Sequence, residues 1–122
     1  MLYVIYAADQ MYGGYHGMAD WSIWNCNNEE EALEIARENS LDIINSYSDI
    51  CEALEEDVKE YIDENTTEEE EWEIRSDIYN EDVEYNVWKI DKDIVKDHDI
   101  EELERWLNDD PEDFIERYCE TV

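Results

Sequence analysis

The sequence predicts an α+β fold in which a small, mainly antiparallel, three-stranded sheet is covered by helices. Hydrophobic residues make up 43% and aromatic residues 12% of the 122 residues, which gives the chain enough apolar surface to fold. Residues 1–28 are rich in strand formers and hold only two charged residues, Asp9 and Asp20. Much of the remainder has apolar residues at helical spacings of three and four. The length is that of one domain, so we expect residues 1–122 to form a single domain.

Three segments have the residue types and the patterns of strands. The run Leu2–Tyr6 does not alternate with polar residues, which indicates a strand buried on both faces. The run Trp21–Cys26 and the run Glu84–Ile90 alternate more clearly and are rich in β-branched and aromatic residues. The expected strands are about 2–7, 20–26 and 84–90.

Helix starts are marked by capping residues or by proline. Asn28, Ser48, Thr67 and Asp99 each precede a helical pattern as a candidate N-cap, and Glu102 lies at the capping-box position after Asp99. Pro111 is well placed at the first position of a last helix. The expected helices are about 29–47, 49–64, 67–82, 100–108 and 111–119.

The second and third predicted helices differ in how clearly their patterns indicate a helix. The apolar face predicted for the second helix consists of Cys51, Leu54, Val58, Tyr61 and Ile62. For the third, the segment Trp72–Ile78 also alternates and is compatible with a strand. We favour the helix, because Thr67 and the run Glu68–Glu71 suit a helix start.

The charge is the unusual property of this chain. It has 38 acidic residues against 8 basic ones, a formal net charge of −30. Self-repulsion at that charge opposes compaction, and a net charge of about 2 to 8 already keeps a small domain soluble. Neither solubility nor adaptation to high salt accounts well for the value. The same charge excludes free nucleic acid and anionic membranes as direct ligands, and predicts a basic protein surface as the partner.

No metal or cofactor site is predicted. Three widely spaced cysteines, Cys26, Cys51 and Cys119, form no CxxC pair, which argues against a disulfide framework and a zinc site. The segment starting at Asp91 resembles an EF-hand loop only in part, because Val95 and Lys96 stand where a ligand and a glycine are needed. Without a signal-like or membrane-spanning run, the expected location is the cytoplasm, with reduced thiols.

Motifs of catalysis are scarce, so we expect no enzyme. The chain has two histidines and no GxSxG, HExxH, P-loop or Rossmann pattern. All three glycines lie between positions 13 and 17, which predicts a shaped loop. Tyr12, Tyr15 and His16 of this loop are candidate secondary contacts to a partner.

The densest acidic stretch runs from the second predicted helix into the third. Residues 52–64 hold seven acids and one base over about 18 Å of helix, or one net negative charge per ~3 Å, close to the spacing of phosphates along one DNA strand. Residues 52–73 together hold twelve acids and one base. The candidate partner-binding residues are Glu55, Glu56, Asp63, Glu64, Glu68, Glu69, Glu70, Glu71 and Glu73.

The chain combines a small size, a charge of −30, the acidic stretch Glu55–Glu71 and an aromatic-rich core. In these features it resembles small acidic phage-encoded anti-defence proteins, including nucleic-acid-mimicking anti-CRISPR proteins. The resemblance is one of type and transfers no functional residue. It implies an inhibitor, in the cytoplasm of the host cell, that occupies the nucleic-acid groove of a CRISPR or other defence nuclease.

Two alternatives remain open. One is a regulatory or immunity-type protein that binds a basic partner through the glycine-rich loop without mimicry. The other is a small enzyme with its site in the loop 9–18. The sequence leaves open whether the chain is a monomer or a dimer.

Overall fold

In a computed structural model of the chain, which describes residues 1–9 and 20–121, four strands form one antiparallel sheet in the order β2-β1-β3-β4. The strands are β1 (Leu2–Asp9), β2 (Asp20–Asn25), β3 (Val83–Ile90) and β4 (Cys119–Thr121). The central strand β1 pairs with β2 and β3, with Val4 opposite Ile23 on one side and Trp88 on the other. Its side chains are buried on both faces of the sheet, as the lack of alternation predicted.

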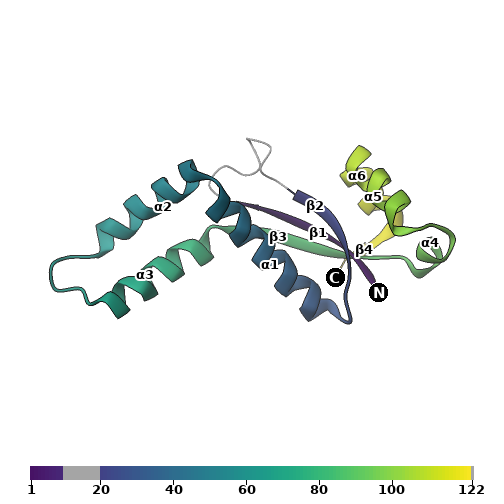
Figure 1. The fold of residues 1–122 in the computed structure, drawn as a ribbon. Coiled ribbons are helices and arrows are strands. Elements are labelled where there is room, and N and C mark those ends of the chain that lie inside the picture. Colours follow the sequence, from purple (N-terminus) through teal and green to yellow (C-terminus); the bar gives the residue numbers. More distant parts are fainter. Residues whose placement is uncertain (10–19, 122) are drawn as a thin grey trace.

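Within the described residues, six helices accompany the sheet (Figure 1). Their bounds are α1 (Glu29–Ser46), α2 (Ser48–Tyr61), α3 (Glu68–Glu81), α4 (Lys92–Asp97), α5 (Ile100–Asp109) and α6 (Pro111–Tyr118). Helix α1 packs on one face of the sheet, against Tyr3, Ile5 and Val87. Helices α5 and α6 pack on the other face, where Leu103, Leu107 and Phe114 join a cluster that includes Val4 and Ile23.

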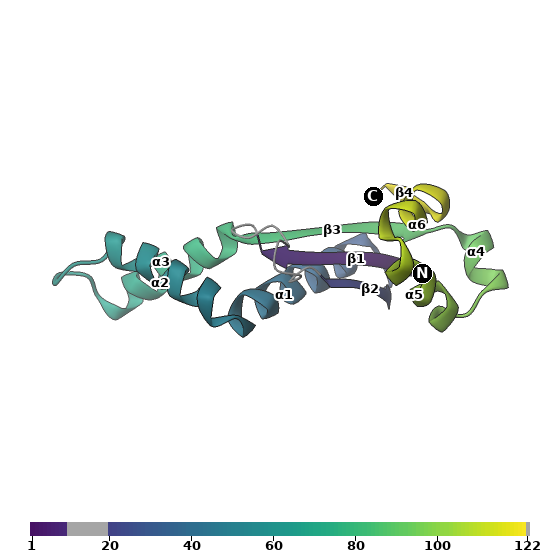
Figure 2. The ribbon, with the colours of Figure 1, turned by 90° about the horizontal axis from the view of Figure 1, so that it is seen from above.

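Helices α2 and α3 form a hairpin that extends beyond the end of the sheet (Figures 1 and 2). A third cluster fixes the base of this hairpin, where Ile44 of α1 packs with Ile50 and Leu54 of α2 and with Val83 at the start of β3. The hairpin is therefore an arm whose inner end is anchored in a core and whose outer part has little protein around it.

Small side chains let α1 lie close to the sheet. The residues of α1 that are fully buried, Ala32, Ala36, Ser40 and Ile44, follow one another at intervals of four. The Ser40 hydroxyl donates to the Ala8 carbonyl at 2.5 Å and accepts from the Glu84 amide at 3.0 Å. Because Ala8 and Glu84 are opposite residues of β1 and β3, Ser40 joins the helix to both strands.

Most predicted helix starts are confirmed. The side chains of Asn28, Thr67 and Asp99 accept from the backbone amides of Glu31, Glu70 and Glu102. The segment 72–78 is helical, so the alternative strand is wrong. Asp91 and Asp99 cap α4 and α5, which leaves the partial EF-hand pattern explained by helix starts.

Four details of the predicted fold are wrong. The sheet has a fourth strand, β4, which follows the last helix directly at Cys119. Helix α4 was not predicted. The N-cap of α2 is Tyr47 rather than Ser48 and makes no side-chain capping bond.

The fourth error is the end of α2, which stops at Tyr61 instead of at about 64. The Asp63 amide donates to the Thr66 hydroxyl at 2.9 Å, and the Asp63 carboxylate accepts from the Asn65 amide at 2.8 Å. These local bonds form a turn that competes with continuation of the helix.

Candidate functional site

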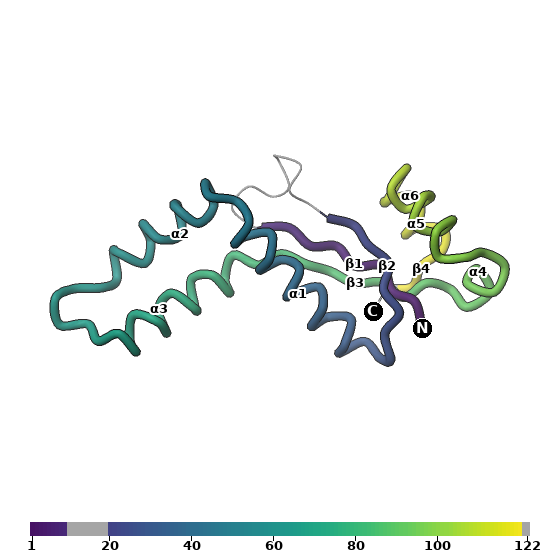
Figure 3. The backbone as a smooth tube through the Cα atoms, viewed as in Figure 1, coloured from purple at the N-terminus to yellow at the C-terminus, as the bar shows by residue number. Residues whose placement is uncertain are grey.

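The hairpin of α2 and α3 carries the greatest concentration of negative charge in the chain. Residues 48–81 contain fifteen acids and two bases, Lys59 and Arg75, a net charge of −13 out of −30. The backbone trace shows the two helices side by side and joined at the outer end by the segment 62–67 (Figure 3). The acidic residues therefore lie on a projecting element that another molecule can reach from several sides.

The structure divides the predicted acidic residues into two groups. Seven of the nine are exposed: Glu56, Asp63, Glu64, Glu68, Glu69, Glu70 and Glu73. The other two, Glu55 and Glu71, are half-buried between the helices and take part in an ion-pair network.

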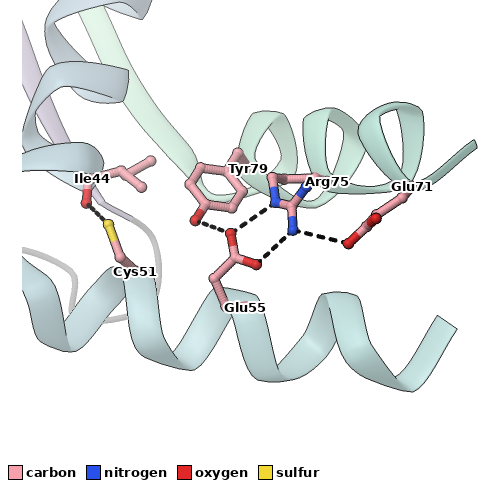
Figure 4. Close-up of polar contacts among 6 residues, drawn as sticks. All are labelled: Ile44, Cys51, Glu55, Glu71, Arg75 and Tyr79. Carbon is pink, nitrogen blue, oxygen red and sulfur yellow. Dashed lines mark hydrogen bonds and ion pairs between the residues drawn. The ribbon is translucent and has the colours of Figure 1, made fainter. Parts of the chain in front are cut away.

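This network connects α2 and α3 through Arg75 (Figure 4). The Arg75 guanidinium donates to both carboxylate oxygens of Glu55, at 2.8 and 3.0 Å, and to Glu71 at 3.3 Å. The Tyr79 hydroxyl donates to the same Glu55 carboxylate at 2.9 Å. On the inner side, the Cys51 thiol donates to the Ile44 carbonyl at 3.1 Å. Glu55 is thus a structural residue that holds the hairpin together.

The titration of these groups follows from the same contacts. The hydrogen bond from Arg75 lowers the pKa of the Glu55 carboxyl, against the opposing effect of burial. Burial and the neighbouring Glu55 carboxylate raise the pKa of Tyr79. At neutral pH, Glu55 is therefore ionised and Tyr79 is a protonated donor.

The run Glu68–Glu71 forms the first turn of α3 behind the Thr67 cap. Carboxylates at this position interact favourably with the positive end of the helix dipole. These four acids therefore stabilise the start of α3 in addition to contributing to the surface charge.

Two grooves flank the hairpin and differ in charge. The larger has a volume of about 500 Å³, and its lining includes Arg37 and Arg75, the single carboxylate Glu55, and Trp72. The smaller has a volume of about 320 Å³ and is lined by Leu54, Asp57, Glu60, Tyr61, Ile78, Glu81 and Asp82. Four carboxylates line the smaller groove, and no lysine or arginine of the described residues does so.

Each groove has an exposed aromatic side chain in its wall. Tyr61 is 69% exposed and Trp72 is 67% exposed, which makes them the most exposed large apolar side chains in the described part of the chain. On the face of α2 for which the sequence predicts Tyr61, Leu54 and Val58 are buried, whereas Tyr61 at the end of the helix is exposed. In the sequence, the acids Asp57, Glu60 and Glu64 at positions close to Tyr61 were a signal of exposure.

The secondary candidate residues, Tyr12, Tyr15 and His16, lie outside the residues that the structure describes, so their prediction stands as made. Among residues 1–9 and 20–121, no group of three or more His, Cys, Asp or Glu side chains has an arrangement that could hold a metal ion. Over the same residues, no helix is both long enough and apolar enough to cross a membrane.

The chain was compared with known proteins. No protein-family model, no curated protein and no solved structure matches it. The charge, exposed side chains and geometry of the chain itself are therefore what indicates its function.

Proposed function

We propose that this protein binds and inhibits a nucleic-acid-binding protein, such as a CRISPR or other defence nuclease, by placing the α2–α3 hairpin in its nucleic-acid groove. The exposed carboxylates of the hairpin then lie where phosphates of the nucleic acid would lie. The observation that carries this proposal is the net charge of −13 on 34 residues that form a projecting two-helix arm.

The dimensions of the arm support a groove as its target. Each helix of the hairpin has 14 residues, which correspond to about 21 Å of length at ~1.5 Å per residue. The core cluster at the base and the Arg75 network join the two helices of the arm without help from a partner. A preorganised arm loses less conformational freedom on binding than a disordered acidic tail does.

The energetics of such binding are mainly electrostatic. A basic groove attracts the arm at long range and raises the association rate, an effect that falls steeply with ionic strength. Binding also releases the anions condensed on the partner's lysines and arginines. The proposal therefore predicts strong salt dependence and direct competition with nucleic acid.

The first test is a pull-down from bacterial lysate with the immobilised protein, with stepwise salt elution and then a challenge by added DNA or RNA. The proposal expects a nucleic-acid-binding protein that leaves at moderate salt and is displaced by nucleic acid. A partner that stays bound at high salt and is not displaced by nucleic acid would contradict mimicry and favour binding through the glycine-rich loop. Alanine substitutions of Tyr12, Tyr15 and His16 would then test that loop.

A second test separates hairpin charge from total charge. One variant replaces the seven exposed candidate acids of the hairpin by Gln or Asn. The matched control neutralises seven exposed acids elsewhere: Glu34, Glu38, Asp42, Asp97, Asp109, Glu116 and Glu120. We expect loss of the captured partner in the hairpin variant and retention in the control, with circular dichroism to check that α3 still forms. Equal loss in both would refute a specific role for the arm.

A further inference from the structure

The two grooves beside the hairpin give a basic partner unequal contacts. In the larger groove, Arg75 is neutralised by Glu55 and Glu71, while Arg37 on α1 makes a hydrogen bond with the amide of Asn80. These two arginines and two carboxylates sum to a net charge of zero at the larger groove. Glu55, the only carboxylate among the described residues of its lining, is already paired with Arg75, so a cationic side chain from a partner gains little there.

The smaller groove is acidic. Its floor includes Leu54 and Ile78, its rim includes Asp57, Glu60 and Glu81, and the ring of Tyr61 forms part of its wall. The last turn of α3, next to this groove, holds no basic residue, so the negative end of the helix dipole is not compensated by its own chain. Apolar floor, aromatic wall and acidic rim together match a long side chain with an aliphatic stem and a cationic head.

We infer that this smaller groove of the α2–α3 hairpin receives an arginine side chain from the basic partner, with the guanidinium stacked on Tyr61 and hydrogen-bonded to the carboxylates of Asp57, Glu60 or Glu81. Arginine is favoured over lysine because its planar guanidinium stacks on an aromatic ring and bonds a carboxylate with two parallel hydrogen bonds. The volume of 320 Å³ is sufficient for one such side chain. The inference rests on the proposed function and identifies the face of the arm that contacts the partner.

The contact adds a short-range component to the binding energy. Exposed charge pairs contribute little once both partners are hydrated, whereas a buried aromatic contact is typical of interface hot spots. Tyr61 is available for that contact, since its side chain is 69% exposed. Trp72, of similar exposure, is in the groove with the two arginines and is the matched control.

The test uses the full-length protein with nona-arginine and nona-lysine peptides, by isothermal titration calorimetry at about 0.15 M salt. One triple variant combines Asp57→Asn, Glu60→Gln and Glu81→Gln. The control triple variant, Glu52→Gln, Glu56→Gln and Glu73→Gln, removes the same charge from the same two helices outside both grooves. We expect about tenfold weaker nona-arginine binding in the groove variant and about threefold in the control.

Tyr61→Ala is expected to weaken nona-arginine binding about fivefold and to remove its advantage over nona-lysine, while Trp72→Ala changes binding less than about twofold. Equal losses in the two triple variants, equal losses in the two aromatic variants, or equal affinity of wild-type protein for both peptides would overturn the inference. The proposed function would survive those results, because it depends on competition between the captured partner and nucleic acid.

Discussion

The ion-pair network at Arg75 is expected to be a main source of stability for the hairpin, and a double-mutant cycle measures it. The variants are Glu55→Gln, Arg75→Gln and the two combined. The side chains of Arg75 and Glu55 are 37% and 36% exposed, so water screens the pair and an isolated surface bridge there would contribute less than about 1 kcal/mol. The two parallel bonds of Arg75 to Glu55, at 2.8 and 3.0 Å, make the pair stronger than a single-bonded bridge. We therefore expect a coupling free energy of about 1 to 1.5 kcal/mol.

Arg75→Gln is expected to cost more than Glu55→Gln. The arginine also bonds Glu71 at 3.3 Å, and it is one of only two bases among residues 48–81. Its loss leaves two carboxylates facing each other without a cation, which we expect to destabilise the protein by about 2 kcal/mol.

Urea unfolding at neutral pH, followed by circular dichroism, is the suitable assay for all four proteins. Urea is uncharged, whereas guanidinium chloride would screen the charges under study. The control cycle is the pair Arg117–Asp113, which is joined by one bond of 3.0 Å with side chains 66% and 48% exposed and should show a smaller coupling. A coupling for Glu55 and Arg75 below about 0.3 kcal/mol would refute the reasoning.

The same cycle predicts a pH dependence. Because the pKa of Glu55 is lower in the folded state, its contribution is fully present above the ordinary pKa of a glutamate, about 4.3. The contribution is lost as the pH falls through the lowered value of the folded state. The difference in unfolding free energy between wild type and Glu55→Gln should therefore shrink below about pH 4. A difference that stays constant down to pH 3 would contradict this assignment of the charge.

Three further predictions concern the remainder of the molecule. Ser40→Ala removes the hydrogen bonds to Ala8 and Glu84 and should lower the free energy of unfolding in urea by about 1 to 3 kcal/mol, whereas Ser46→Ala, on the exposed side of α1, should lower it little. Equal losses in the two variants would count against the role of Ser40 in joining α1 to both strands. Added NaCl should raise the thermal midpoint, because screening reduces self-repulsion at a net charge of −30, and a constant or falling midpoint would contradict that reasoning. Burial raises the pKa of the Cys119 thiol to about 12. In a Cys26→Ala/Cys51→Ala variant, a disulfide reagent at pH 8 should therefore label the folded protein far more slowly than the urea-unfolded protein, and similar labelling rates would contradict the burial of Cys119.

The elements with strong local signals could be predicted from the sequence. Asn28, Thr67 and Asp99 cap their helices through bonds within a few residues, so these starts are encoded locally. The uninterrupted apolar run of β1 predicted burial on both faces for a similar reason, because the pattern of the segment itself reports its surroundings.

Other elements depend on residues far away in the chain. The three residues of β4 have no strand pattern of their own and are ordered by pairing with β3. Just beyond the pair Ile90–Cys119, the Asp91 amide donates to the Tyr118 carbonyl at 2.8 Å. The length of α2 depends on the turn around Asp63, whose side-chain bonds compete with helical ones. Short elements and helix ends of this kind are decided by small differences between competing hydrogen bonds.

The acidic character of the candidate site was determined by the sequence alone, since charge is a property of composition and lies mostly on the surface of any fold. Tertiary structure decided how that charge is used. Pairing of α2 with α3 placed Glu55 on Arg75, where it holds the arm together, and left seven of the nine predicted acids exposed, whereas Glu71 meets Arg75 within α3 at i,i+4. It also gave the arm two grooves of different charge and left Tyr61 exposed. A helical pattern tells which residues share a face, but only the packing of helices determines which faces meet.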